Sequence, residues 1–155
     1  MNLSSARSGD PRHDPVRVLF LCTHNSARSI MAEALLRHKG RDAYEVVSAG
    51  IEPGEVRPLT LRVLREAGLP TDGLRSKSVT ELMGQRFDYV VTVCDAARRS
   101  CPQFPGEGQR LHWAYEDPSA VEGTEEERLR AFREVFAAMA RHIDLFLSVG
   151  ARASP

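Results

Sequence analysis

Short apolar runs alternate with segments of helical periodicity along most of this chain, and that alternation is the strongest constraint on its fold. Residues Val16–Leu21 and 87–93 are rich in β-branched and aromatic side chains, as expected of strands covered on both faces. Weaker strand patterns occupy 44–47 and 110–113. Strands that alternate with helices predict a single-domain α/β fold, with a parallel four-stranded sheet and helices on both faces. Ligands of such sheets bind beyond the carboxyl ends of the strands.

The helices are predicted from the spacing of apolar residues and from residues typical of helix ends. Helical spacing covers three segments before the C-terminal region, at 26–39, 58–67 and 78–83. Gly40 stands where the residue after a helix often adopts a left-handed conformation. Thr124 and Glu127 have the form of a capping box and open a long C-terminal helix. We therefore predict one domain at 15–150, between a flexible leader at 1–14 and a frayed tail at 151–155.

Charge and cysteine content exclude several classes of protein. The 21 Lys and Arg residues balance the 21 Asp and Glu residues, which argues against a nucleic-acid-binding protein. The apolar runs are far shorter than the roughly 18 residues of a membrane span, and residues 1–14 lack the apolar stretch of a secretory signal. Three cysteines in a 155-residue chain favour free or redox-active thiols over structural disulfides. We therefore expect a cytoplasmic protein with no membrane and no nucleic-acid partner.

Cys22 follows the first predicted strand, and Arg28 lies six positions later, where the first helix opens. A loop that runs into a helix N-terminus directs backbone N–H groups inward, and these form a cradle for a tetrahedral oxyanion. The predicted oxyanion-binding loop comprises Thr23, His24, Asn25, Ser26, Ala27, Arg28 and Ser29.

Arg28 can clamp two oxygens of the anion with its planar guanidinium group. The same positive field predicts a lowered pKa for Cys22, which makes this thiol a nucleophile at neutral pH. Ser29 can hydrogen-bond the sulfur, and Asn25 tolerates the left-handed backbone of a tight loop. The alternative for Cys22 is a buried, inert cysteine, which is the usual state of a free thiol.

A second candidate group is Asp117, which follows the fourth predicted strand and precedes a proline. An acidic residue before proline is often only part of a turn. Beside an oxyanion loop, however, Asp117 can protonate a leaving oxygen, and Trp113 and Tyr115 can exclude water.

The remaining two cysteines, Cys94 and Cys101, lie at and after the end of the third predicted strand. A parallel sheet brings Cys94 to the same edge as Cys22, so the three thiols can form a relay. Zinc binding is the alternative, but six intervening residues do not match common zinc spacings, and no metal is predicted. If 95–100 is helical, the two Cα atoms lie about 10 Å apart. Because a disulfide needs roughly 4.4–6.8 Å, its formation requires this helix to unwind.

Two stretches resemble the low-molecular-weight tyrosine phosphatase family, VLFLCTHNSARSIMAEALL at 18–36 and EDPSA at 116–120. Two further stretches are similar to the thioredoxin-coupled arsenate reductases within that family. These are VVTVCDAARRSCP at 90–102 and HWAYEDPSAVEGTEEE at 112–127. The resemblance implies one catalytic domain with the phosphatase fold.

The resemblance also implies the roles of the site residues. Arsenate, with phosphate or sulfate as competing oxyanions, binds the loop of Cys22 and Arg28, and Asp117 is the acid. Cys22, Cys94 and Cys101 then pass on a disulfide that thioredoxin reduces, and no cofactor is needed. Two rival functions are a phosphatase with a phosphocysteine at Cys22, which leaves two cysteines unused, and an anion-binding or redox-sensing module without turnover.

The chain departs from the family pattern at several positions. Relatives commonly have Gly where His24 stands and Cys where Ala27 stands. The aromatic residues that follow Asp-Pro in the phosphatases are replaced by Ser119 and Ala120. A cation site found in some of these reductases maps to four positions, Asn25, Glu33, Ser48 and Lys77. Lys77 replaces a carboxylate there, so we expect its ammonium near Glu33 and Ser48, in place of the cation. The alternative is that Lys77 is a solvated surface residue.

Overall fold

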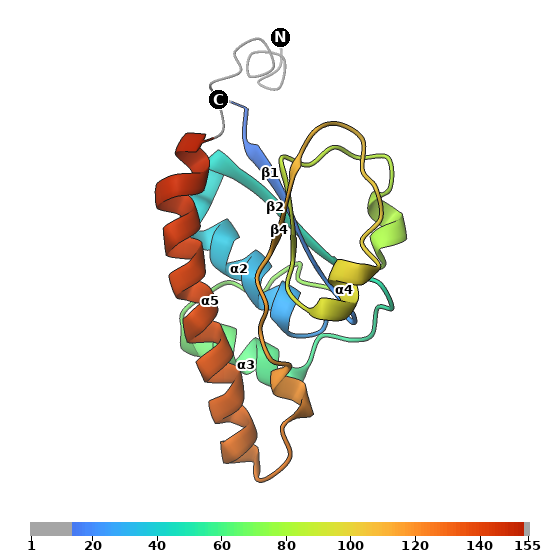
Figure 1. The fold of residues 1–155 in the computed structure, drawn as a ribbon. Coiled ribbons are helices and arrows are strands. Elements are labelled where there is room, and N and C mark those ends of the chain that lie inside the picture. Colours follow the sequence, from blue (N-terminus) through green and yellow to red (C-terminus); the bar gives the residue numbers. More distant parts are fainter. Residues whose placement is uncertain (1–13, 154–155) are drawn as a thin grey trace.

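A parallel sheet of four strands forms the centre of the molecule in the computed structural model, which describes residues 14–153 (Figure 1). The strands are β1 (Val16–Cys22), β2 (Tyr44–Gly50), β3 (Tyr89–Thr92) and β4 (Gln109–His112), in the spatial order β2-β1-β3-β4. Every neighbouring pair is parallel. The predicted α/β fold with a parallel four-stranded sheet is therefore confirmed.

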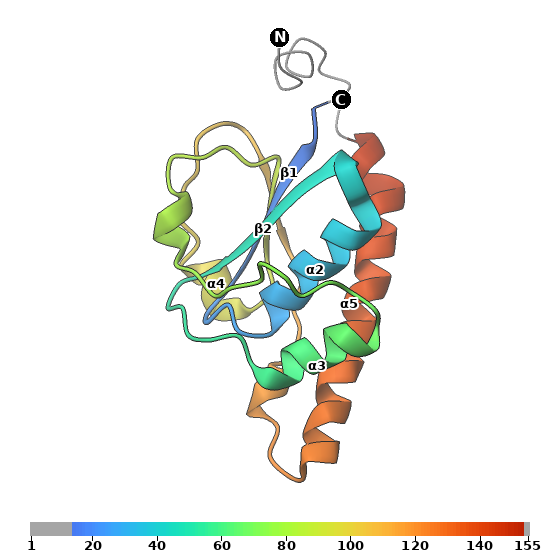
Figure 2. The ribbon, with the colours of Figure 1, turned by 180° about the vertical axis from the view of Figure 1, so that it is seen from behind.

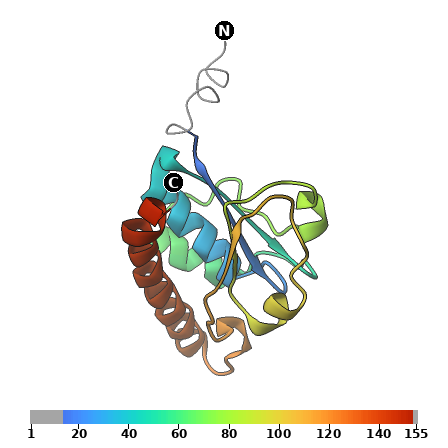
Figure 3. The ribbon, with the colours of Figure 1, turned by 45° about the horizontal axis from the view of Figure 1, so that its top comes forward.

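Helices cover the sheet in two unequal groups. The α-helices are α2 (Arg28–Gly40), α3 (Pro58–Glu66), α4 (Asp95–Arg99) and α5 (Glu125–Ala153), and the 3₁₀ turns are η2 (Arg41–Ala43), η3 (Val79–Leu82) and η4 (Pro118–Ala120). The helices α2, α3 and α5 contact one another in one layer (Figure 2). The shorter α4 and η3 lie away from α5 (Figure 3) and contribute buried Ala97, Val79 and Leu82 to the core.

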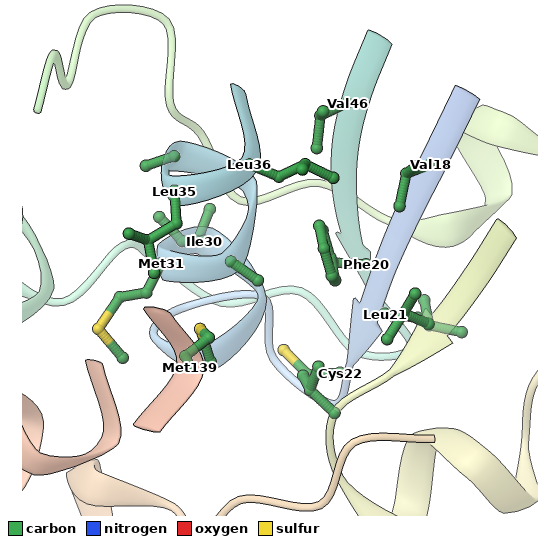
Figure 4. Packing of buried hydrophobic residues seen from close by; sticks show 14 of the residues in the cluster. Val18, Phe20, Leu21, Cys22, Ile30, Met31, Leu35, Leu36, Val46 and Met139 are labelled. Carbon is green, nitrogen blue, oxygen red and sulfur yellow. The ribbon is translucent and has the colours of Figure 1, made fainter. Parts of the chain in front are cut away.

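The centre of the core is β1, whose residues 18–21 are fully buried. Phe20 points toward α2 and Leu21 points to the other side of the sheet (Figure 4), as expected of a strand covered on both faces. Burying each such side chain contributes roughly 1.5–3 kcal/mol. The strand that carries the candidate nucleophile is therefore firmly anchored.

The end of α2 differs from the prediction. Gly40 is the last residue of the helix, and the residue with a positive φ is Arg41, with φ of 50° and ψ of −137°. The reason for glycine here is space, because a Cβ on Gly40 would lie 2.5 Å from Cδ1 of Tyr44. The glycine therefore lets the chain turn closely into β2.

The two termini were predicted to be flexible. Residues 1–13 of the expected leader and 154–155 of the expected tail lie outside the described residues. Helix α5 continues to Ala153, so it includes the first three residues of that expected tail. Between residues 14 and 153, no helix is both long enough and apolar enough to cross a bilayer.

The topology gathers the candidate groups at one edge of the sheet. Cys22 ends β1, Cys94 follows β3 by two residues, and His112 ends β4 just before the segment with Asp117. Leu21 is paired with Thr92, and Thr92 with His112, so the three strands end at the same level.

Candidate active site

The loop after β1 is folded tightly around the sulfur of Cys22. The Sγ atom lies 2.8 Å from Oγ of Ser29 and accepts a hydrogen bond from the backbone N–H of Asn25 at 3.2 Å. Nδ2 of Asn25 donates to the same Ser29 oxygen at 2.7 Å, which leaves the Ser29 hydroxyl proton free to point at the sulfur. Asn25 has a φ of 52°, the left-handed conformation that the sequence predicted for it.

Gly50 at the end of β2 allows the loop to lie close to the sheet. A Cβ at this position would lie 2.8 Å from the carbonyl oxygen of Thr23 and 3.0 Å from the backbone nitrogen of Asn25. Both are backbone atoms of the oxyanion loop, so a larger residue would displace the loop itself. Sequence reasoning missed this residue, because the contact joins the end of β2 to the loop after β1, two segments that are distant in the chain.

Cys22 is only 3 % exposed, and this burial raises the pKa of its thiol. The hydrogen bonds from Ser29 and Asn25 and the charge of Arg28 act in the opposite direction but do not prevail. The prediction of a lowered pKa is therefore wrong for this structure, because it counted the positive field of the loop and omitted desolvation. Ionisation of Cys22 depends on these hydrogen bonds.

Arg28 joins the oxyanion loop to the segment that carries Asp117. Its Nη1 donates to the carbonyl oxygen of Tyr115 at 3.0 Å, and its Nη2 lies 3.7 Å from Oδ2 of Asp117. The structure thus brings together the nucleophile loop and the candidate acid, which are almost 90 residues apart in the chain.

The carboxylate of Asp117 is held by Ser119, which the sequence analysis did not connect with it. Oδ1 accepts hydrogen bonds from the backbone N–H and the hydroxyl of Ser119, at 3.0 and 2.6 Å. Burial alone would raise the pKa of Asp117, but the Ser119 hydrogen bonds and the charges of Arg28 and Arg57 outweigh it and lower the pKa. Asp117 is therefore ionised at neutral pH until negative charge is brought beside it.

Trp113 and Tyr115 pack against α5. The Trp113 ring stacks on His142 with centroids 5.5 Å apart, and the Tyr115 hydroxyl hydrogen-bonds Nδ1 of His142 at 2.5 Å. These contacts direct both side chains to an aromatic cluster with α5, and Tyr115 contacts Arg28 through its carbonyl group. His142 was missed, because nothing in its helical spacing distinguishes it from a surface residue.

The two other thiols stand at opposite ends of α4. Cys94 is buried and caps the helix, with its Sγ accepting from the Ala97 N–H at 3.4 Å and lying 3.2 Å from Oγ1 of Thr23. Cys101 is partly exposed and its Sγ contacts the carbonyl oxygen of Pro102 at 3.6 Å. Burial raises the pKa of Cys101, against the opposing charge of Arg110. Cys22, Cys94 and Cys101 are all free thiols in the structure.

A buried polar network supports the oxyanion loop from behind. Nδ2 of Asn25 donates to Oγ of Ser48 at 2.9 Å, and this hydroxyl donates to Oε1 of Glu33 at 2.5 Å. Glu33 in turn is ion-paired with Arg37. Arg37 was missed, although the four-residue spacing of an acid and a base on one helix could have indicated the pair. Among residues 14–153, no group of three or more His, Cys, Asp or Glu could hold a metal ion.

Lys77 also contacts residues of this network. Its Nζ donates to the carbonyl oxygens of Ser48 at 2.8 Å and Arg75 at 3.2 Å, and its backbone N–H donates to Oδ1 of Asn25 at 2.9 Å. Burial lowers the pKa of Lys77, with Glu33 acting in the opposite direction. The ammonium lies beside Ser48 as expected, but the ion pair of Glu33 is with Arg37.

Comparisons with known proteins agree on one family. The family model for the low molecular weight phosphotyrosine protein phosphatases matches residues 17–151. An arsenate reductase of Halalkalibacterium halodurans is 37 % identical over 133 residues, which cover 86 % of this chain and 96 % of that protein. A solved arsenate reductase in its phosphate-binding state has 25 % identity and a TM-score of 0.70, covering 86 % of this chain and 97 % of the other.

A thioredoxin-dependent arsenate reductase of Corynebacterium glutamicum is 31 % identical, with a TM-score of 0.57. The match covers 90 % of this chain and 68 % of the other. The family match spans nearly all of the described residues and includes the oxyanion loop, α4 and the Asp117 segment. The chain therefore belongs to the low molecular weight phosphotyrosine protein phosphatase family.

Proposed function

We propose that this protein is an arsenate reductase that works through three thiols. The observation that carries the proposal is the 3.2 Å contact between Oγ1 of Thr23 and Sγ of Cys94. It means that the second thiol lies against the loop that surrounds the first one. A simple phosphatase has no use for a buried thiol at this position, whereas a reductase needs a second sulfur within reach of Cys22.

In the first step, arsenate binds to the loop with Arg28 holding two of its oxygens. The sulfur of Cys22 attacks arsenic, an arsenic–oxygen bond breaks, and the oxygen leaves as water after taking up protons. One proton comes from the thiol. Asp117 supplies the other, because the negative charge of the bound arsenate raises the pKa of the carboxylate, which takes up a proton from solvent and passes it to the leaving oxygen. Arsenic is still pentavalent at this stage.

In the second step, the sulfur of Cys94 attacks the sulfur of Cys22. A Cys22–Cys94 disulfide forms, the sulfur–arsenic bond breaks, and its electron pair reduces arsenic to arsenite. Cys101 then attacks Cys94 and releases Cys22 as a thiolate. The product is a Cys94–Cys101 disulfide, which a thioredoxin reduces back to two thiols. This chemistry requires no metal and no organic cofactor.

Two features support the proposed reductant and substrate. The related Corynebacterium glutamicum enzyme is described as thioredoxin-dependent, and another related arsenate reductase binds phosphate. We accordingly propose thioredoxin as the partner, and phosphate and sulfate as competing oxyanions. Because a thiol relay requires cysteines to be kept reduced, we place the protein in the cytoplasm.

We also propose that Lys77 takes the place of a bound cation behind the oxyanion loop. Its ammonium donates to the Ser48 carbonyl oxygen, and its backbone N–H donates to Asn25, the residue that in turn donates to Ser29. A covalently attached charge is present at any salt concentration, whereas a bound ion stabilises a protein according to its concentration.

The experiment that tests the function measures arsenate reduction with thioredoxin and thioredoxin reductase, next to hydrolysis of an aryl phosphate by the same preparation. We expect sustained arsenate reduction that stops when thioredoxin is omitted. Aryl phosphate hydrolysis without arsenate reduction would instead support the phosphatase alternative. Absence of both activities from a folded protein that binds phosphate would support an anion-binding module.

A further inference from the structure

His112 lies between the sheet and the helix that separates Cys94 from Cys101. Its Nδ1 is 2.7 Å from Oγ1 of Thr92 in β3, and its Nε2 is 3.1 Å from Oδ1 of Asp95, the first residue of α4. Each nitrogen of the ring thus contacts a different element. His112 is the link between the end of β4 and the start of α4.

Thr92 keeps this link intact in both protonation states of the imidazole. When His112 is neutral, Nε2–H donates to Asp95 and Nδ1 accepts from the Thr92 hydroxyl. When His112 is charged, Nδ1–H donates to the same oxygen, and Thr92 can donate to the carbonyl oxygen of Leu111, 3.4 Å away. Asp95 remains the acceptor in both states. The geometry is that of a structural link that tolerates a change of charge.

The helix that His112 holds has little stability of its own. Helix α4 has five residues, and Ala97 is its only buried residue. At its two ends, the Arg98 N–H donates to the Cys94 carbonyl oxygen and the Ser100 N–H donates to the Ala96 carbonyl oxygen. Isolated helices of this length do not form in water, because nucleation costs more than a few hydrogen bonds return. The contact between Asp95 and His112 therefore adds to the Cys94 cap and to the buried Ala97 in keeping α4 folded.

We propose that His112 is a positioning residue that holds α4 folded through Asp95 in the reduced protein and thereby opposes formation of the Cys94–Cys101 disulfide. The inference rests on the proposed thiol relay. Cys94 and Cys101 are seven positions apart, which at the helical rise separates their Cα atoms by about 10 Å, and a disulfide needs 6.8 Å or less. Oxidation must therefore unwind α4 and remove the Cys94 sulfur from its capping bond with Ala97. Unwinding also separates Asp95 from His112.

The redox step itself is the exchange already described. Cys101 attacks Cys94 in the Cys22–Cys94 disulfide, the new bond joins Cys94 to Cys101, and Cys22 leaves with the electron pair. A contact present only before this step shifts the equilibrium toward the dithiol form. Removing the contact should make the Cys94–Cys101 disulfide more stable and harder to reduce.

The test uses the full chain with Cys22→Ser, so that only the Cys94–Cys101 couple can be oxidised. Asp95→Ala, His112→Phe and the double variant are equilibrated in glutathione redox buffers and analysed by thiol alkylation. Asp144→Ala makes the same chemical change at another exposed ion pair, with Lys39 on α2, and is the matched control. Amide exchange at Ala97, Arg98 and Ser100 is measured on the reduced proteins in parallel.

Each single variant should shift the dithiol–disulfide equilibrium about fivefold toward the disulfide, as expected for one partly exposed hydrogen bond to a carboxylate. At 29.6 mV per tenfold change, this is about 20 mV toward more negative potential. The three amides should exchange about fivefold faster. The double variant should resemble the single ones, because both remove the same contact. Asp144→Ala should change nothing.

Three outcomes overturn the inference. Additive effects in the double variant would mean that Asp95 acts through the helix dipole and independently of His112. Unchanged exchange would mean that His112 does not hold α4. An unchanged potential in a chain that does form the disulfide would remove the redox role of His112 and leave the relay standing. Failure of Cys94 and Cys101 to form a disulfide in any chain would instead overturn the relay, and with it this redox role.

Discussion

The oxyanion loop at 22–29 and the relay segment at 94–101 are built on the same plan but differ in rigidity. Each begins with a cysteine at a strand end and continues into a helix. The loop leads into α2, a 13-residue helix with eight consecutive buried residues, 29–36. The relay segment leads into the five-residue α4, in which only Ala97 is buried.

The difference corresponds to what each segment has to do in the proposed reaction. An oxyanion site gains from donors that are fixed before the substrate arrives, because no reorganisation is then needed in the transition state. A relay cysteine has to change partners, so the structure around it must be able to open. The same kind of strand-to-helix connection can form a rigid binding loop or a segment that opens. Which of the two it forms depends on how much of the helix surface is buried.

The largest effects on activity are expected when the three thiols are replaced one at a time. Cys22→Ser should reduce both arsenate reduction and any aryl phosphate hydrolysis to background, because both need the nucleophile. Cys94→Ser or Cys101→Ser should abolish only sustained arsenate reduction, since hydrolysis needs only Cys22, the loop and the acid. Steady-state assays of both reactions on folded variants decide this. An equal loss of hydrolysis in Cys94→Ser and Cys22→Ser would contradict the division of roles.

The two segments should also differ in mobility when the protein is oxidised. Hydrogen exchange of residues 94–108 should rise by orders of magnitude on oxidation, because the disulfide and α4 cannot coexist. The loop at 22–29 should keep its protection. Gly106, with a φ of 91°, and the prolines at 102 and 105 favour irregular backbone at the far end, so the unfolding should stay local. Identical protection of 94–108 in the two redox states would rule out this movement.

The third prediction concerns the hydrogen bonds that support the buried Cys22. Ser29→Ala removes the hydroxyl 2.8 Å from the sulfur, so the pKa of Cys22 should rise further. A higher pKa leaves less thiolate at neutral pH. The kcat/KM for arsenate should therefore fall roughly tenfold at pH 7 and approach the unsubstituted value at high pH, as one pKa unit is about tenfold in thiolate. Thr60→Ala, at a buried hydroxyl that bonds the Ser26 carbonyl, is the control. A drop in kcat/KM that is the same at every pH would show that Ser29 acts in another way.

The smallest effect is expected from potassium. If Lys77 supplies the fixed charge, melting curves in potassium and in sodium at equal ionic strength should coincide for the unsubstituted chain. Arsenate reduction should likewise not respond specifically to potassium. A clear rise in melting temperature with potassium alone would show that an ion still binds beside Ser48 and Asn25.

Much of the fold was predictable, because hydrophobic periodicity is a local property. The strand that ends at Cys22 and the capped C-terminal helix follow directly from it. The site residues that were missed are of a different kind. Arg57, His142 and Gly50 act on segments far away in the chain, so no local pattern indicates them.

The error about Cys22 has the same origin. Its position before a helix was visible in the sequence, and the sign of the field there was predicted from it. The degree of burial results from packing of α2 and β1, which the sequence pattern does not quantify. Desolvation therefore reversed the predicted direction of the pKa shift.

The contact between Arg28 and the Tyr115 carbonyl has a consequence for the entropy of substrate binding. A free arginine side chain has about 2 kcal/mol of rotamer entropy, which an anion would have to remove in order to be clamped. In this protein the guanidinium is already held at 3.0 Å by a main-chain oxygen, and its side chain is 13 % exposed. The rotamer entropy of Arg28 is therefore already lost during folding, before the substrate binds. The affinity of the oxyanion loop for an anion thus depends also on the Asp117 segment, whose ordered main chain holds Arg28.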